Sequence, residues 1–347
     1  MSRETLVILN PASRGGSTGR RWPGIARRIE ATLGSVRIER TEAAGDARRL
    51  AREACDRGVE RIVVAGGDGT VGEVASGLLD REPGARPILG LLPLGSGCDL
   101  ARSLGLPRRV GAALEVVAAG ATRRIDAARL EYRDASGARC HGWFVNEVSA
   151  GLSGVTTQIV GRISKRVGPR IGFAAGAIAA IFSHRPVAMR IEADGKPIHA
   201  GPVSLIVASN GRHFGAGMAV APKAELDDGW LEIVVVRGLS VPRLLVNLPS
   251  LFRGTHLDHP AVSRHAAREL VVMPASGSFA PGCETGTAAA VGAGSESENS
   301  PIEADGEPLG GLPFRAEIVP AALRVFAPAA SVRQPDAGAA ARTEAPA

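Results

Sequence analysis

Short apolar runs alternate with amphipathic stretches along the first 122 residues. Most of the apolar runs have the length of a strand and end at proline or glycine, and the stretches between them place apolar side chains at helical spacing. The predicted strands are Leu6–Leu9, Val36–Ile38, Arg61–Ala65 and Ile88–Leu92, and the predicted helices are Ile25–Leu33, Asp46–Cys55 and Val71–Leu79. This alternation predicts a parallel sheet covered by helices, in which ligands bind beyond the carboxyl ends of the strands.

The alternation of predicted strands and helices stops at about residue 122, and strand-like runs dominate after it. These runs are Ile125–Tyr132, Gly142–Val148, Val187–Ala193, Pro202–Ala208, Leu231–Val236 and Glu269–Met273, and only Gln158–His184 and Val241–Arg253 are long stretches of another kind. Strands joined without intervening helices favour antiparallel pairing. We therefore predict an α/β domain over residues 1–122 and a strand-rich, mostly antiparallel domain over residues 123–327, whose last strand is free to return to the first domain.

Two segments have low complexity. Residues 275–300 are rich in glycine, alanine and serine, and residues 328–347 are rich in alanine and proline. Because neither segment carries enough large apolar side chains to form a core, we predict that both are disordered.

The net charge and the cysteine content restrict the classes of protein to which this chain can belong. The formal net charge is +6 and is not gathered in one basic block, so it favours anionic partners such as nucleotides or acidic lipids and does not indicate nucleic acid. The four cysteines are far apart, which fits free thiols in the cytoplasm. The longest apolar stretch, Phe173–Phe182, is well short of the roughly 20 residues of a membrane span, so membrane contact is expected to be peripheral.

A glycine-rich loop lies between a predicted strand and a predicted helix. Residues 66–70 read Gly-Gly-Asp-Gly-Thr, and glycines let backbone N–H groups approach phosphate oxygens at the positive end of the helix. Asp68 would repel phosphate unless Mg²⁺ or an acceptor hydroxyl lay beside it. The alternative is a glycine-rich turn with an aspartate cap.

Two further loops follow predicted strands in the same way. Residues 10–16 follow the first strand, and residues 93–102 follow the fourth, where Ser96 can donate a hydrogen bond to phosphate and Asp99 can cap a helix. Residues 10–16 alone are equally compatible with an ordinary turn at the end of a strand. Because parallel strands end at one edge of a sheet, however, the three loops are expected to converge there.

Taken together, these segments resemble the diacylglycerol kinase catalytic-domain family, which includes bacterial lipid kinases, diacylglycerol kinases and sphingosine and ceramide kinases. The matching segments are Leu9–Pro11, Gly66–Val74, Pro93–Arg102, Ala221–Gly229 and Asp305–Pro308. They cover most of residues 5–327 in the order of the family. The resemblance implies a nucleotide-binding first domain, a lipid-acceptor second domain, and ATP and Mg²⁺ bound between them.

The resemblance also implies roles for single residues. The residues expected to contact the nucleotide are Asn10, Thr41, Gly66, Gly67, Asp68, Gly69, Thr70, Val71, Gly72, Glu73 and Ser96. Asp68 would help to hold the catalytic Mg²⁺, and Glu307, ahead of Asp305, would be the general base for the lipid hydroxyl. The loop that contains Glu225, Asp228 and Trp230 would bind a second Mg²⁺, partly through backbone carbonyls.

One loop departs from the family pattern. The usual sequence Gly-Thr-Gly-Asn-Asp reads Gly-Ser-Gly-Cys-Asp here, so Ser96 keeps the hydroxyl whereas Cys98 replaces an amide with a weak hydrogen-bonding group. The substitution calls into question how the nucleotide or the acceptor is positioned near Cys98. The linker formed by residues 275–300, which precedes the Asp305–Pro308 segment, is also longer than this junction usually needs.

Other functions are compatible with the same motifs. A kinase similar to NAD kinase or phosphofructokinase would share the Gly-Gly-Asp-Gly sequence and act on a soluble acceptor, and a catalytically weak relative would only bind lipid or nucleotide. The basic run Arg162, Lys165, Arg166 and Arg170 fits peripheral contact with an anionic membrane, or else a solvated helix face. The acceptor stays open among diacylglycerol, a sphingoid base, ceramide, phosphatidylglycerol and a polyprenol, and a homodimer is compatible with the sequence.

Overall fold

The computed structural model describes residues 4–156, 176, 178–275 and 300–329. The two segments predicted to be disordered lie almost entirely outside these residues, and the basic run Arg162–Arg170 lies wholly outside them. The helices are α1 (Ser17–Leu33), α2 (Asp46–Asp56), α3 (Asp68–Leu79), α4 (Asp99–Ser103), α5 (Val110–Ala119) and α8 (Val241–Arg253), with 3₁₀ turns at Pro83–Ala85 and His256–Asp258. The strands are β1 (Thr5–Leu9), β2 (Arg37–Arg40), β3 (Arg61–Gly66), β4 (Ile88–Pro93), β5 (Thr122–Arg133), β6 (Arg139–Phe144), β7 (Glu147–Gly151), β8 (Val187–Ala193), β9 (Lys196–Ser209), β10 (Leu231–Arg237), β11 (Val262–Ala267), β12 (Glu269–Pro274), β13 (Pro301–Ala304) and β14 (Glu307–Phe326).

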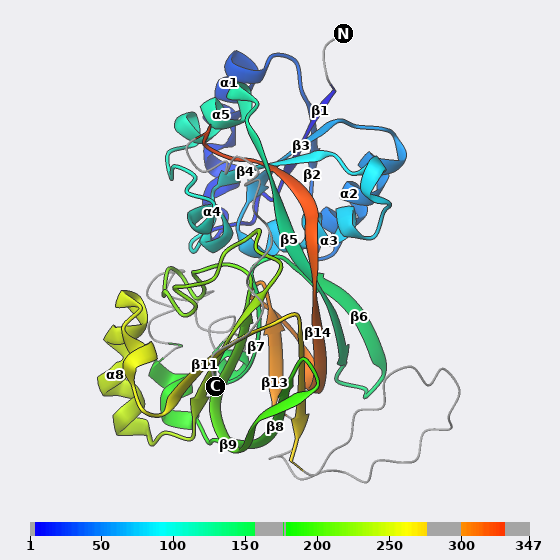
Figure 1. Cartoon of the computed structure of the whole chain (residues 1–347). Helices are drawn as coiled ribbons and strands as arrows, with labels where there is room; N and C mark the ends of the chain where they lie inside the picture. The colour runs from blue at the N-terminus through cyan, green and yellow to red at the C-terminus, as the bar shows by residue number, and fades with distance from the viewer. Residues whose placement is uncertain (1–3, 157–175, 177, 276–299, 330–347) are drawn as a thin grey trace.

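The first lobe is a parallel sheet flanked by helices, as the alternating pattern predicts. Its strand order is β2-β1-β3-β4, and β14 adds a further parallel strand beside β4. Helices α1 and α5 lie on one side of this sheet and α2 and α3 on the other (Figure 1). The loops after β1, β3 and β4 therefore meet at the carboxyl edge of the sheet, which faces the second lobe.

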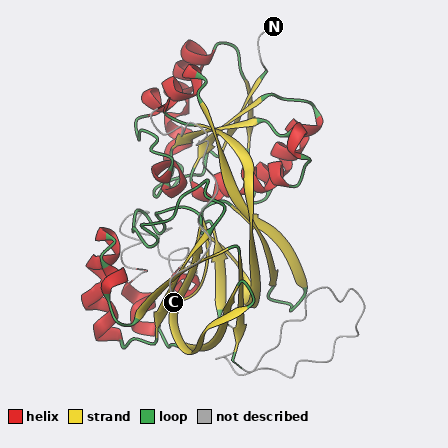
Figure 2. Ribbon diagram, in the orientation of Figure 1, coloured by secondary structure: helices red, strands yellow, loops and turns green. Residues whose placement is uncertain are grey.

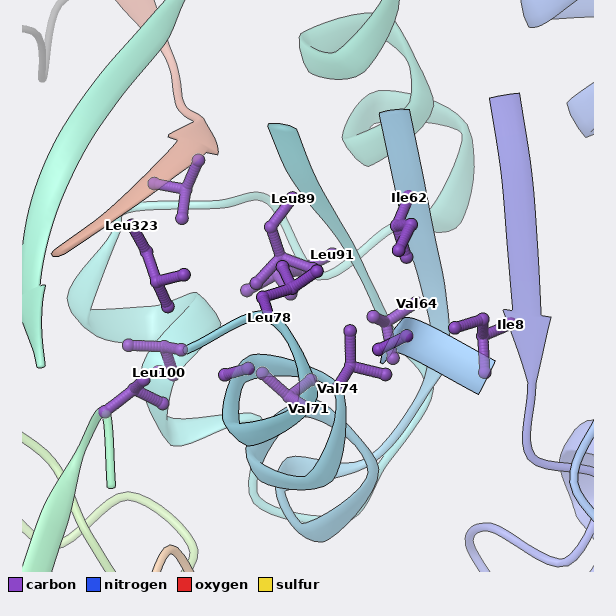
Figure 3. Packing of buried hydrophobic residues seen from close by; sticks show 14 of the residues in the cluster. Ile8, Ile62, Val64, Val71, Val74, Leu78, Leu89, Leu91, Leu100 and Leu323 are labelled. Carbon is purple, nitrogen blue, oxygen red and sulfur yellow. The ribbon is translucent and has the colours of Figure 1, made fainter. Parts of the chain in front are cut away.

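Two clusters of buried side chains hold the helices to the sheet. Leu6 and Ile8 belong to the cluster under α2 and α3, whereas the alternating Val7 and Leu9 belong to the cluster under α1 and α5. Figure 3 shows the first cluster, in which side chains of β1, β3 and β4 pack against α3 and α4. Each fully buried Val, Leu or Ile contributes about 1.5–3 kcal/mol of transfer free energy, so this packing fixes the position of α3 and its N-terminus.

The second lobe is strand-rich and antiparallel, in agreement with the predicted fold class (Figure 2). Two long strands, β5 and β14, pair with one another and run from this lobe into the first. Because β14 also pairs with β4 at Val325, one sheet continues through both lobes.

One expectation about a single strand was wrong. The predicted strand Gly142–Val148 is divided into β6 and β7, because the backbone at Val145 and Asn146 turns to bind a side chain from another part of the chain. The last strand, for which no bounds were predicted, is β14; it is 20 residues long and returns to the first lobe beside β4. In the described residues, no helix is both long enough and apolar enough to cross a membrane.

Candidate active site

The glycine-rich loop joins β3 to α3 at the carboxyl edge of the sheet. A Cβ atom at Gly66 would lie 2.7 Å from Oγ1 of Thr70, so only glycine leaves room for this side chain to fold back over the end of β3. Nδ2 of Asn10, at the end of β1, donates a hydrogen bond to the same Oγ1 at 2.9 Å. The structure thus brings together two of the predicted loops. Thr41 follows β2 at the same edge, where its buried N–H donates to the carbonyl of Leu9 at 2.9 Å.

Asp68 connects this loop to the loop before α4. Its carboxylate accepts hydrogen bonds from the backbone N–H groups of Cys98 at 2.6 Å and Asp99 at 2.7 Å. Burial raises the pKa of Asp68, and the backbone donors oppose that rise. Burial and the nearby Asp68 carboxylate raise the pKa of Asp99 to about 7. The two carboxylates therefore form a buried acidic pair that favours the presence of a proton or a cation.

Cys98 contributes to this arrangement through its backbone. Its φ of 54° lies in the left-handed region, which asparagine tolerates better than most residues. The thiol is buried, and burial raises its pKa to about 12, so it stays protonated at neutral pH and is a poor nucleophile. Its side chain is not among those that line the cavity described below. The backbone conformation at this position therefore suits the asparagine of the family pattern.

Asp305 lies in the turn between β13 and β14, where it and Gly306 have φ values of 50° and 82°. Both values suit a two-residue hairpin turn, the tightest kind. Its carboxylate accepts hydrogen bonds from three backbone N–H groups, those of Val145 at 2.9 Å, Asn146 at 2.8 Å and Glu147 at 3.2 Å. Burial nevertheless raises its pKa to about 6. These bonds hold Asp305 in place and explain the break between β6 and β7.

Glu307 begins β14 and lies across the glycine-rich loop. A Cβ atom at Gly69 would lie 2.1 Å from Oε1 of Glu307, so the absence of a side chain at residue 69 lets the carboxylate approach. The surrounding protein and the charge of Glu73 raise the pKa of Glu307, although the residue is exposed at the rim. Among the described residues, no hydrogen bond occupies this carboxylate, which distinguishes it from Asp305.

Glu73 has a different environment from the other predicted nucleotide contacts. Its carboxylate accepts hydrogen bonds from the N–H groups of Gly45 at 3.0 Å and Ala47 at 3.1 Å. It therefore connects α3 to the N-terminus of α2 and does not line the cavity. Val71 lines the cavity. Gly72 packs against Asp305: a Cβ atom added at residue 72 would lie 3.1 Å from the Cβ of Asp305.

The predicted second metal loop lies before β10. Oδ1 of Asp228 accepts a hydrogen bond from the N–H of Trp230 at 3.0 Å, and burial, followed by the charge of Glu225, raises the pKa of Asp228 to about 6. The neighbouring Asp126, which the sequence did not single out, is buried and accepts N–H groups of Gly229 and Ala321, both at 2.7 Å. In the described part of the chain, no three His, Cys, Asp or Glu side chains are placed to hold a metal ion by themselves.

A cavity of about 840 Å³ joins the glycine-rich loop to the second lobe. One part of its wall is polar and is formed by Asp68, Ser96, Asp99, Arg108, Asn146, Glu147, Glu303, Asp305 and Glu307. The other part is apolar and is formed by Leu152, Ile181, Leu205, Phe214, Met218, Val220, Leu248, Leu251 and Phe252. The structure therefore places both predicted catalytic turns and Ser96 around one space, and leaves Glu225, Asp228 and Trp230 outside its lining.

Sequence reasoning missed several of the lining residues. Glu147 and Glu303 each stand alone in a strand, and Asn146 lies in a run that reads as continuous strand. The one available signal was Glu147, a charged residue beside valine within the predicted strand Gly142–Val148, because such a carboxylate needs a partner when it is buried.

Comparison with known proteins identifies the family. Residues 4–130 match the diacylglycerol kinase catalytic domain, and residues 146–327 match the YegS C-terminal NAD kinase beta sandwich-like domain. A "Probable lipid kinase YegS-like" of Chromohalobacter salexigens is 32% identical over 94% of this chain and 94% of the relative. One of the same description from Pectobacterium atrosepticum is 31% identical over 93% of this chain and 96% of the relative.

A crystal structure of a diacylglycerol kinase from Bacillus anthracis shares the fold, with a TM-score of 0.66 and 21% identity over 95% of this chain and 98% of that one. The chain belongs to the diacylglycerol kinase catalytic-domain family, and the two relatives above are both described as probable YegS-like lipid kinases.

Proposed function

We propose that this protein is an ATP-dependent lipid kinase that transfers the γ-phosphoryl group to a lipid hydroxyl. The observation that carries the proposal is the composition of the cavity, in which the carboxylates beside the glycine-rich loop and a wall of apolar side chains enclose one space. A soluble acceptor would leave the apolar wall in contact with water, whereas an acyl or alkyl chain would cover it.

The donor end suits the phosphates of ATP. The N-terminus of α3 and the backbone N–H groups around residues 66–70 offer positive partial charge, and the hydroxyl of Ser96 lines the same space. Arg108 adds a full positive charge to the lining. We propose that Asn10, Thr41 and the loop hold the nucleotide here.

The donor atoms at both acidic sites are chemically suited to Mg²⁺, which prefers oxygen ligands. Asp68 would hold a catalytic ion, which would neutralise the charge of the transferred group when bound. Because no three side chains there converge on one point among the described residues, phosphate oxygens and water would have to complete the coordination. Glu225, Asp228 and the carbonyl of Trp230 would hold a second, structural ion, whose charge would oppose the burial and the repulsion from Glu225 that raise the pKa of Asp228.

Glu307 is the better candidate for the general base, and Asp305 for the residue that positions the loop. Three backbone donors already use the lone pairs of Asp305, whereas the carboxylate of Glu307 lies over the glycine-rich loop without a hydrogen bond from the described residues. A base must reach the acceptor proton with a free lone pair. The lipid hydroxyl would lose its proton to Glu307 as it attacks the γ-phosphorus, and ADP would leave.

We also propose that the apolar end of the cavity opens toward a membrane. Helix α8 has no buried residue, and its Val246 and Phe252 side chains are 79% and 53% exposed. Phe182, in the helical residues 178–183, is 65% exposed. Phe252 also lines the cavity, so the exposed apolar surface is continuous with the proposed lipid site. Arg243 and Arg253 of α8 would favour an anionic surface.

Vesicle co-sedimentation tests the membrane contact. Vesicles that contain anionic lipid should bind the protein, and Phe182→Asp or Val246→Asp should reduce binding several-fold relative to an Asp→Asn control at exposed Asp56. High salt should weaken the binding by screening the arginines. Equal sedimentation of the apolar-to-Asp variants and wild type would contradict the contact.

Acceptor choice tests the function itself. Formation of ADP should depend on a lipid alcohol in mixed micelles, and NAD⁺ should not substitute for it. Phosphorylation of NAD⁺ alone would indicate a kinase for soluble acceptors, and ATP binding without any transfer would indicate a catalytically weak relative.

A further inference from the structure

A loop of the second lobe reaches across to the first lobe beside the cavity. This loop, residues 211–218, lies between β9 and β10 and is called the strap below. Phe214 and Met218 exchange two backbone hydrogen bonds at 3.0 and 3.1 Å, which close the strap into a small hairpin. At its tip, residues 215–217 have φ values of 64°, 64° and 104°. Because the central one, Ala216, is not a glycine, the tip needs contacts that hold it in this shape.

Helix α4 turns a polar face toward the strap. The helix lies on the side of the first lobe that faces the second lobe (Figure 1). Asp99, Arg102 and Ser103 share one face of α4, because residues three and four apart are neighbours on a helix. Leu100 and Leu104 point elsewhere and belong to the buried cluster of Figure 3. The apolar residues of α4 thus hold it to the first lobe and leave its polar residues for another partner.

Two hydrogen bonds join this polar face to the strap. Oδ2 of Asp99 accepts the N–H of Ala216 at 2.9 Å, and Oγ of Ser103 accepts the N–H of Arg212 at 3.1 Å. The first bond acts on the residue whose φ is unusual, so it holds the strap where the backbone is strained. The strap is therefore bound to the first lobe at its tip and near its start.

Gly217 lets the tip of the strap lie close to α4. A Cβ atom at residue 217 would lie 2.8 Å from Nη2 of Arg102, and the φ of 104° would strain any side chain there. Only glycine leaves the guanidinium group room beside the strap. The fit between the strap and α4 is thus set by shape as well as by hydrogen bonds.

The strap is also bound to the second lobe. The N–H of Ala219, directly after the strap, donates to the carbonyl of Leu251 in α8 at 2.8 Å. Phe214 and Met218 pack against a small buried cluster that includes Leu205 of β9, and both residues line the apolar part of the cavity. The strap therefore connects α4, beside the glycine-rich loop, with α8 at the apolar end of the cavity.

We propose that α4 positions the acceptor by holding the strap, so that Phe214 and Met218 stay against the hydrocarbon chain of the bound lipid. The positioning residues are those of its polar face, Asp99, Arg102 and Ser103. This inference rests on the proposed lipid kinase function and adds to it a contact between the lobes that determines how well the acceptor binds.

The same short helix also holds the donor end of the reaction. The N–H groups of Cys98 and Asp99, where α4 begins, bind the carboxylate of Asp68. One element therefore sets the distance between the loop that would bind phosphate and the wall that would bind the chain. Phosphoryl transfer depends on such an alignment of donor and acceptor.

Steady-state kinetics of Gly217→Ala test the inference. The added Cβ atom would push the strap away from Arg102, so the variant should bind the lipid chain less well. With 1-O-octadecylglycerol in mixed micelles, we expect KM for the lipid to rise about fivefold or more while kcat and KM for ATP change less than about twofold, because the chain is bound equally in the ground state and the transition state. A variant that only unfolds more easily would lose kcat and keep its KM. An unchanged KM for the lipid, or an equal rise in KM for ATP, would overturn the inference.

Gly137→Ala is the matched control. Gly137 also has a positive φ, 83°, but lies in the turn between β5 and β6, where an added Cβ atom would meet open space. It should share the backbone strain of Gly217→Ala and keep the wild-type KM for the lipid. Ser103→Ala, which removes one hydrogen bond to the strap, should raise the same KM about twofold or more and serves if Gly217→Ala does not fold. Thermal unfolding verifies the fold of each variant, and a folded Ser103→Ala protein with the wild-type KM would contradict the role of Ser103.

Hydrogen exchange and lipid binding separate this inference from the proposed function, because neither needs ATP. In Gly217→Ala and Ser103→Ala, peptides that cover the strap should exchange several-fold faster than in wild type, whereas peptides of β9 should not change. Faster exchange together with weaker retention of tritiated 1-O-octadecylglycerol on gel filtration supports the inference even if wild type transfers no phosphate, in which case the kinase function alone would be wrong. Unchanged exchange in the strap, or equal retention of the lipid by wild type and variants, would overturn the inference whatever the activity.

Discussion

Removal of the Asp68 carboxylate should destabilise the protein as well as stop catalysis. In the native state this carboxylate accepts two backbone N–H groups at 2.6 and 2.7 Å. Hydrogen bonds to a charged group contribute about 1.5–3 kcal/mol each, so Asp68→Ala would lose about 3–6 kcal/mol before any compensation. Relief of the repulsion between Asp68 and Asp99 offsets part of this loss. We expect a net loss of about 2–4 kcal/mol for Asp68→Ala, and about half of that for Asp68→Asn, which keeps one acceptor oxygen.

Urea unfolding at pH 7 measures this loss. Asp56→Asn is the matched control, because Asp56 is an exposed carboxylate whose ion pair with Arg81 should contribute no more than about 1 kcal/mol. If Asp68→Ala unfolds within about 0.5 kcal/mol of wild type, the two hydrogen bonds do not hold the loop before α4 and the reasoning fails.

Three further predictions concern the same region. The pKa of Asp99 rises from 3.8 to about 7 on folding, so wild type loses stability as pH rises from about 4 to 7. Asp99→Asn should therefore gain stability relative to wild type over this range, and a pH-independent difference in unfolding free energy would be inconsistent with this. Gly66→Ala should lower the unfolding free energy by about 1–3 kcal/mol, because its Cβ would displace the side chain of Thr70. The same displacement should weaken ATP binding measured by calorimetry, and an affinity equal to that of wild type would contradict the tight fit. Glu307→Gln should reduce kcat by about 100-fold or more with little change in thermal unfolding, whereas Asp305→Asn should also lower the melting temperature; a normal kcat for Glu307→Gln would exclude it as the base.

The architecture of the first lobe could be predicted because parallel strands buried on both faces are continuous apolar runs. Leu6–Leu9 and Ile88–Leu92 stand out in the sequence for this reason, and each is followed by the loop that the edge of the sheet needs. Three loops after three such strands were enough to place Asn10, Asp68 and Ser96 at one edge. The antiparallel lobe follows in the same way from strands without intervening helices.

Long-range contacts could not be predicted from local pattern. Glycines and prolines interrupt the sequence of β14, so that its 20 residues do not read as a strand, and its pairing with β5 overrides those local signals. Likewise, nothing near Val145 indicates that the carboxylate of Asp305, 160 residues away, turns the backbone there. The polar cavity wall escaped notice because Glu147 and Glu303 are adjacent only after β7 and β13 pair.

The destination of the γ-phosphate tests most directly whether the two ends of the cavity serve one reaction. ATP labelled with ³²P at the γ position, incubated with Mg²⁺ and 1-O-octadecylglycerol in mixed micelles, should give a labelled product that extracts into organic solvent. ATP labelled at the α position should give none, and Glu307→Gln should give little. Label that remains in ATP and inorganic phosphate, or that appears only in a water-soluble acceptor, would contradict the proposal that this protein phosphorylates a lipid hydroxyl.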